Sequence, residues 1–133
     1  MLSKNQAKII QSLRLKKFRQ KYNLFVAEGM KTLQTIILSD QYKIKTLYFT
    51  KPLDFNIKNE HEITQVSIDE RTMKSISFLN NPSNVLALVE TLTPEQIDWQ
   101  KGIYLDGVQD PGNVGTIIRI ADWYGYDAVI RSP

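Results

Sequence analysis

The 133-residue sequence has no cysteine, a single histidine and no long apolar run. The absence of cysteine excludes a disulfide framework, a thiolate metal site and a cysteine nucleophile. No apolar stretch approaches the roughly 20 residues that span a bilayer, and the N-terminus lacks the apolar core of a signal peptide. With 42% hydrophobic and 23% charged residues, the composition is that of a globular protein, so we expect a cytoplasmic protein that needs no metal and no membrane.

Acidic residues are scarce in the first 51 positions. Eleven lysines and arginines accompany only Glu28 and Asp40 there, a formal charge of +9, whereas residues 52 to 133 hold six basic and twelve acidic residues, a formal charge of −6. Such a separation attracts a polyanion to the N-terminal part. Nucleic acid is therefore the first candidate partner, although a solvated lysine-rich helix face explains the charge run alone equally well.

The spacing of apolar residues predicts helices in the first part of the chain. Residues 5 to 20 alternate apolar and basic side chains at helical spacing, which predicts an amphipathic basic helix broken near Leu15. Residues 30 to 38 return to the same spacing. A third helix is expected after Ser67, because Ser67 with Glu70 three residues later forms a capping-box pattern. The apolar residues expected on one face of this helix are Met73, Ile76 and Leu79.

Strands are expected where β-branched, aromatic and other apolar residues cluster between turn residues. These clusters lie at residues 24–27, 46–50, 62–67 and 85–89. Strands that alternate with helices indicate an α/β protein with a parallel or mixed sheet covered on both faces.

A change of composition between Thr91 and Gly102 predicts a linker. Residues 1 to 92 then form a first domain, residues 93 to 102 the linker, and residues 103 to 133 the beginning of a second domain. The chain is long enough for one ordinary domain and too short for two complete ones. We therefore expect the sequence to stop inside its functional domain.

The segment from Ile103 to Trp123 holds a predicted strand (103–108), a glycine-rich turn and a predicted helix (116–123). The turn contains Gly107, Gly112 and Gly115, and the free amides at the start of the helix would favour an anion or an electron-rich atom. No Gly-x-Gly pair and no Gly-Lys-Ser or Gly-Lys-Thr occurs, which excludes a dinucleotide fingerprint and a P-loop. The alternative is that the glycines only pack a tight turn between strand and helix.

Asn113 and Arg119 are the candidate functional side chains of this segment. Six residues apart around a predicted helix start, both could face the carboxyl end of the strand, where ligands bind in open α/β sheets. A guanidinium held there could engage a phosphate or a polarised hydroxyl. A salt bridge from Arg119 to Asp106 or Asp122 is the alternative, and spacing alone does not decide between them.

The run from Leu105 to Gly125 resembles the first signature motif of the SpoU (TrmH-type) RNA 2′-O-ribose methyltransferases. The N-terminal part resembles the L30e-like substrate-binding domain of that family through the basic helix ending at Arg19, the segment Leu24 to Gly29, and Asn81-Pro82 leading into the strand 85–89. The resemblance implies a three-layer α/β/α L30e-like domain, followed by the truncated βαβ start of a trefoil-knot domain.

The resemblance further implies an RNA 2′-O-ribose methyltransferase that uses S-adenosylmethionine and acts on ribosomal RNA. Arg119 would contact the target ribose or its phosphate and stabilise the developing alkoxide, and Asn113 would position the substrate. The residues expected to contact RNA are Lys16, Lys17, Arg19, Lys21 and Lys31.

Members of this family continue with a glutamate-containing loop and a serine-asparagine-rich loop, which complete the knot and most of the methyl-donor pocket. Neither motif occurs in these 133 residues. We therefore expect an incomplete S-adenosylmethionine site and an inactive chain, whereas the complete enzyme is expected to be a homodimer.

Two other functions are compatible with the sequence. The first is a non-catalytic L30e-like RNA-binding module in which the residues from Ile103 onward are an extension. The second is a small nucleotide-binding α/β protein, which the lack of a phosphate-binding fingerprint disfavours.

Overall fold

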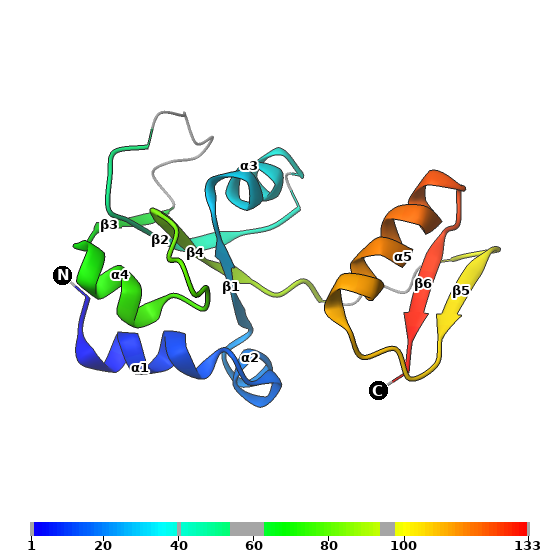
Figure 1. The fold of residues 1–133 in the computed structure, drawn as a ribbon, viewed down its shortest axis with the longest axis horizontal. Helices are drawn as coiled ribbons and strands as arrows, with labels where there is room; N and C mark the ends of the chain where they lie inside the picture. Colours follow the sequence, from blue (N-terminus) through cyan, green and yellow to red (C-terminus); the bar gives the residue numbers. More distant parts are fainter. Residues whose placement is uncertain (1, 40, 54–62, 94–97, 133) are drawn as a thin grey trace. The chain divides into compact units, whose positions relative to one another are not determined.

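The computed structural model describes residues 2–39, 41–53, 63–93 and 98–132. The chain divides into two compact units, Met1–Thr93 (unit 1) and Pro94–Pro133 (unit 2) (Figure 1). The helices of unit 1 are α1 (Lys4–Ser12), α2 (Lys16–Tyr22), α3 (Met30–Ser39) and α4 (Glu70–Ile76). Its strands are β1 (Leu24–Glu28), β2 (Ile44–Phe49), β3 (Thr64–Ser67) and β4 (Val85–Glu90). Unit 2 contains β5 (Gly102–Leu105), α5 (Pro111–Trp123) and β6 (Ala128–Arg131).

The sheet of unit 1 is mixed and has the strand order β1-β4-β2-β3. The inner strand β4 runs antiparallel to both of its neighbours. Glu90 of β4 lies opposite Leu24 of β1, and Val85 of β4 lies opposite Phe49 of β2. Strands β2 and β3 are parallel. The continuous apolar sequence of β4 suits this position, because an inner strand covered on both faces has no side chain that meets water.

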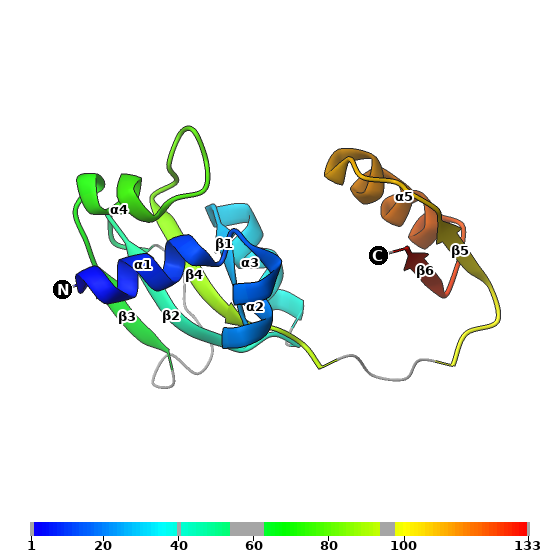
Figure 2. The ribbon, with the colours of Figure 1, turned by 90° about the horizontal axis from the view of Figure 1, so that it is seen from below.

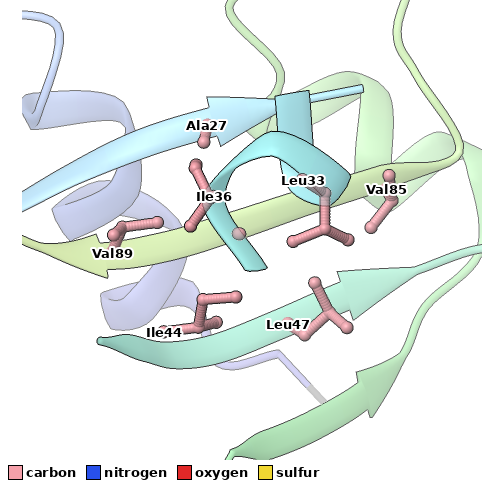
Figure 3. Close-up of a cluster of buried hydrophobic side chains, with 8 residues drawn as sticks. Ala27, Leu33, Ile36, Ile44, Leu47, Val85 and Val89 are labelled. Atoms are coloured by element: carbon pink, nitrogen blue, oxygen red, sulfur yellow. The ribbon is translucent and has the colours of Figure 1, made fainter. Parts of the chain in front are cut away.

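Side chains of β4 alternate between two hydrophobic cores, one on each face of the sheet. The first core lies between the sheet and α3 (Figure 3) and consists of Ala27, Leu33, Ile36, Ile44, Leu47, Val85, Ala87 and Val89. The second core lies on the other face, between the sheet and helices α1 and α4, and consists of Ile10, Leu13, Leu24, Tyr48, Met73, Ile76, Leu86 and Leu88. Figure 2 shows α1 and α3 on opposite sides of the sheet. The predicted α/β/α arrangement is confirmed.

The basic N-terminal segment forms two helices, as the spacing of its apolar residues predicts. Ser3 caps α1 through a capping box with Gln6, and the helix ends at Leu13. Leu15 has an extended backbone (φ −93°, ψ 131°) and precedes α2. The break therefore falls at the predicted place.

Helix α4 differs from the prediction at both ends. Its N-cap is Asp69, whose carboxylate accepts a hydrogen bond from the amide of Thr72. Ser67 cannot cap a helix because it is paired with Phe49 in the ladder between β2 and β3. At the other end the helix stops at Ile76, and Leu79, expected on the buried face, is 50% exposed.

Unit 2 pairs β5 with β6 in parallel and joins them through α5. Strand β5 ends at Leu105 rather than at Val108, and α5 begins five residues before the predicted start, because Asp110 caps it and Pro111 occupies its first turn. Gly112 and Gly115 therefore lie inside the helix. Only Gly107 serves the turn, with a φ of +66° that other residues rarely adopt.

Parts of two sequence predictions fall on positions that the structure does not describe, namely Glu62 at the start of the third predicted strand and residues 94–97 of the predicted linker. The histidine of the sequence, His61, also lies outside the described residues. Across the described ranges, none of the helices combines the length and the apolar character that crossing a bilayer requires.

Candidate nucleic-acid interface

Helix α2 has the sequence Lys-Lys-Phe-Arg-Gln-Lys-Tyr and contains no acidic residue. Its three lysines, Lys16, Lys17 and Lys21, are exposed. Within the described part of the chain, no carboxylate forms an ion pair with any of these ammonium groups. The structure therefore places four of the five predicted RNA-binding residues on one short helix, and the charges of its three lysines are available to an external anion.

Two aromatic rings accompany these lysines on α2. The rings of Phe18 and Tyr22 lie nearly parallel, with an interplanar angle of 15° and a centroid separation of 6.4 Å. Lys17 Nζ lies 5.0 Å from the Phe18 centroid, and Lys21 Nζ lies 5.5 Å from that of Tyr22. Residues four apart are neighbours on a helix surface, so one helical turn aligns two rings and two cations.

Arg19 behaves differently from the lysines around it. Its Nη1 donates hydrogen bonds to the carbonyl oxygens of Leu13 (2.9 Å) and Arg14 (2.7 Å). These carbonyls follow the end of α1, where no further helical amide is available to bond them. Arg19 thus fixes α2 against the end of α1, and the structure does not place its guanidinium together with the free lysines.

Arg14 is a functional neighbour of α2 that the sequence patterns did not single out. Its Nη2 donates to the carbonyl oxygen of Ser77 (2.9 Å), and its guanidinium lies 4.7 Å from the centroid of the Phe78 ring. Glu28 binds the same segment from β1, accepting hydrogen bonds from Ser77 Oγ and the Phe78 amide, both at 2.6 Å. These long-range contacts have no sequence signal. They connect the C-terminal ends of α1, α4 and β1 to one another.

Lys31 lies apart from the α2 lysines. It is exposed on α3, and α3 packs on the opposite face of the sheet from α1 and α4. Phe25 packs against the first core and meets Tyr42 edge to face. Neither residue belongs to the surface formed by α2.

In unit 2, Asn113 and Arg119 are both exposed on α5. From one to the other the helix rises about 9 Å and turns so that the two side chains point about 120° apart. The buried and half-buried apolar side chains of α5 that pack toward the sheet are Val114, Ile117 and Ala121. Helical geometry puts Arg119 on the side opposite this stripe and Asn113 near its edge. The two side chains thus leave α5 in different directions, and their convergence on one substrate stays a prediction.

The alternative of a salt bridge is not met. Arg119 forms no hydrogen bond or ion pair with any residue that the structure describes, Asp106 and Asp122 included. Its guanidinium is therefore free to meet a group from outside unit 2.

The start of α5 does not provide the expected anion site. Asp110 Oδ2 accepts a hydrogen bond from the amide of Asn113 at 2.8 Å, so a carboxylate already occupies this helix end. A Cβ placed on Gly107 or Gly115 would meet no atom within 4 Å, so no other part of the described chain closes over these glycines.

Comparison with known proteins identifies the family. Residues 4–87 match the model of the MRM3-like substrate binding domain. The sequence is 30% identical over 129 residues to the 23S rRNA (guanosine(2553)-2'-O)-methyltransferase RlmP of Bacillus subtilis (strain 168), covering 96% of this chain and 52% of that protein.

Solved structures agree with this result. One is a putative RNA methyltransferase of the TrmH family from Porphyromonas gingivalis, with a TM-score of 0.81 and 34% identity over 98% of this chain and 52% of that one. Another is an AdoMet-bound rRNA methyltransferase from Sinorhizobium meliloti, with a TM-score of 0.76 and 32% identity over 98% of this chain and 53% of that one. The chain thus spans about half the length of these relatives.

Fold and comparisons together define unit 1 as a substrate-binding domain of the kind that RNA methyltransferases carry. The chain belongs to the SpoU (TrmH-type) RNA methyltransferase family, and its residues 4–87 form an MRM3-like substrate binding domain. The family resemblance seen in the sequence is confirmed.

Proposed function

We propose that this chain provides the RNA-binding part of an S-adenosylmethionine-dependent 2′-O-ribose methyltransferase that acts on ribosomal RNA in the cytoplasm. The observation that carries the proposal is the exposed cluster of Lys16, Lys17 and Lys21, which has no acidic partner among the described residues, in a domain that matches a substrate-binding family. The Bacillus subtilis relative is named for methylation of 23S rRNA, which favours ribosomal RNA as the substrate class.

The chemistry of α2 suits phosphate binding. Lysine ammonium groups neutralise backbone phosphates and release condensed counterions, which gives affinity that falls steeply with salt. Contacts of this kind hold the nucleic acid in place but select little sequence. Unit 1 would therefore deliver RNA to the methyl-transfer site, and target choice would depend on further contacts.

Arg119 and Asn113 are our candidates for the reacting end of unit 2. A ribose 2′-hydroxyl is a poor nucleophile, so methyl transfer needs an oriented hydroxyl and stabilisation of the charge that develops on its oxygen. A guanidinium keeps its charge at every working pH, so Arg119 would stabilise the alkoxide rather than accept its proton. The support is that Arg119 is exposed and has no partner among the residues of unit 2 that the structure describes.

S-adenosylmethionine would supply the methyl group in the longer members of this family. The two motifs expected to complete its pocket do not occur in these residues, so we assign no step through it to this chain. A non-catalytic RNA-binding module remains the second candidate for these 133 residues, favoured by the open surroundings of Gly107 and Gly115.

Charge reversal tests RNA binding. We expect Lys16→Glu, Lys17→Glu and Lys21→Glu together to abolish binding of ribosomal RNA fragments at low salt, measured by fluorescence anisotropy. The matched control reverses Lys4, Lys51 and Lys74, which are exposed on other parts of unit 1 and change the net charge by the same amount. An equal loss of RNA affinity in both variants would mean that only the net charge matters. Unchanged affinity in the α2 variant would refute the assignment of RNA binding to α2.

A further inference from the structure

We propose that α2 binds unpaired bases, through a stacking platform formed by Lys17, Phe18, Lys21 and Tyr22. The RNA held at this helix would then be a single-stranded segment or a loop, rather than continuous duplex. The inference rests on the proposed RNA-binding function and adds the class of RNA that unit 1 recognises. It is carried by the two rings and the two cations that one helical turn aligns.

The two rings are positioned as a platform rather than as core residues. Both are only half-buried, and Tyr22 packs against the second core, which anchors the ring from below. A centroid separation of 6.4 Å between nearly parallel rings means that the rings are offset, so part of each face is not covered by the other ring. The ammonium groups of Lys17 and Lys21 lie over the rings of Phe18 and Tyr22.

The lysine contacts are weak enough for a base to replace them. A cation over an aromatic ring at an exposed site contributes about two- to five-fold to an equilibrium constant. A nucleic-acid base stacked on such a ring contributes roughly five- to 150-fold. The displaced ammonium group does not lose its attraction, because it moves to the phosphate beside the stacked base.

The platform is held in place before RNA arrives. Arg19 fixes the start of the helix through the carbonyls of Leu13 and Arg14, and Asn23 ends it in the left-handed conformation at φ 51°. Strand β1 begins at the next residue, Leu24, which is buried in the second core. Binding therefore requires little ordering of the helix, which favours affinity.

Stacking on α2 selects unpaired RNA for a geometric reason. In a duplex each base is already stacked between its neighbours, and the deep major groove of A-form RNA is closed to side chains. Bases in loops and single strands can turn outward and lie on an aromatic ring. The lysines alone would bind both duplex and unpaired RNA, so the preference for unpaired RNA comes from the rings.

The decisive test compares RNAs on the unaltered chain. The probes are a short single-stranded RNA with one 2-aminopurine, the same strand with abasic sites, and a duplex of equal phosphate number. We expect tightest binding to the base-containing strand, at least about five-fold weaker binding to the abasic strand, and quenching of 2-aminopurine fluorescence on binding. No variant is needed, so the result does not depend on the folding of an altered protein.

Variants then locate the effect on α2. Phe18→Leu and Tyr22→Leu keep apolar bulk against unit 1 and remove the rings, so we expect each to lose the preference for the base-containing strand and the fluorescence quenching. Tyr22→Phe should retain both, and so should Trp123→Leu, which removes an aromatic side chain that is 85% exposed on α5.

The outcomes separate this inference from the proposed function. Equal affinity for the base-containing and abasic strands, with binding still lost in the α2 lysine variant, would overturn stacking and leave RNA binding intact. Failure of the unaltered chain to bind any of the three RNAs at low salt would overturn both.

Discussion

Basic side chains on one short helix have different tasks because of the atoms that lie within their reach. Lys16 and Lys17 meet solvent, whereas Arg19, two residues further on, reaches two carbonyl oxygens beyond the end of α1. A guanidinium can donate several hydrogen bonds in fixed directions, which suits it to carbonyls that lack a helical partner. The exposed lysines have no such hydrogen bonds to break, so they can bind an approaching phosphate more readily than Arg19 can.

Arg119 provides a prediction at the level of one side chain. Because it is exposed and makes no hydrogen bond or ion pair with the described residues, Arg119→Ala should change the free energy of unfolding by no more than about 0.5 kcal/mol. Thermal and denaturant unfolding of the chain measure this. RNA affinity of unit 1 should also be unchanged, since α2 lies in the other unit. Loss of more than about 1 kcal/mol would assign the residue a structural task instead.

The lowered pKa of Asp69 predicts how the stability of unit 1 changes at acid pH. The amide of Thr72 donates to its carboxylate and, with a smaller effect from the charge of Arg71, lowers the pKa of Asp69 below its ordinary value of 3.8. A lowered folded-state pKa adds stability that is present above pH 3.8 and disappears as the pH falls through the folded value. Asp69→Asn keeps a capping side chain without the charge, so we expect its thermal midpoint to fall less over this range. An equal fall of the thermal midpoint in the unaltered chain and in Asp69→Asn over this pH range would contradict the assignment.

At the level of elements, the ends of helices depended on contacts that the local sequence does not contain. Glu28 accepts hydrogen bonds from Ser77 Oγ and the Phe78 amide, so the chain leaves α4 at this point and Leu79 is left exposed. The prediction that Leu79 lies on the apolar face of this helix is therefore wrong. Helix α5 began early because Asp110 and Pro111 form a favourable start, which outweighed the cost of two glycines inside the helix.

The join between α1 and α2 can be tested through Arg19. Arg19→Gln removes the charged donor to Leu13 and Arg14, so we expect a loss of about 1 to 3 kcal/mol in the free energy of unfolding of unit 1. RNA affinity should fall as well, because the platform is no longer held in place. Lys8→Gln is the matched control, with one charge removed from an exposed position on α1 and no loss of stability or RNA affinity expected. Denaturant unfolding followed by RNA titration distinguishes the two effects.

For the whole molecule, charge and fold divide along similar lines. Residues 1 to 93 carry a formal charge of +6 and residues 94 to 133 a charge of −3, so the excess of positive charge belongs to unit 1. Unit 1 also has two hydrophobic cores, whereas unit 2 has a two-stranded sheet and one helix. A two-stranded pair is marginally stable alone. We therefore expect unit 1 to supply most of the stability and the proposed attraction for RNA.

Methyl transfer is a property that we expect this chain not to show by itself. Incubation of the 133 residues with ribosomal RNA and S-adenosylmethionine labelled in the methyl group should leave the RNA unlabelled, because the two motifs expected to complete the methyl-donor pocket do not occur in these residues. RNA binding in the same sample is the positive control. Incorporation of label would show that these residues suffice for catalysis.

The sequence by itself determined the features that depend on neighbouring residues. The apolar run of β4, the interrupted spacing near Leu15 and the excess of lysine in α2 each act over a few positions, and each predicted the observed strand, break or exposed cation. The motif around Asn113 and Arg119 likewise indicated the family.

Only the tertiary structure decided which residues act together. Glu28 meets Ser77, 49 positions along the chain, and Arg14 meets the same residue at a separation of 63. The separation of Lys31 from α2 follows from the side of the sheet on which α3 packs. These outcomes depend on how the hydrophobic faces of all elements are buried at once, and no local pattern contains that information.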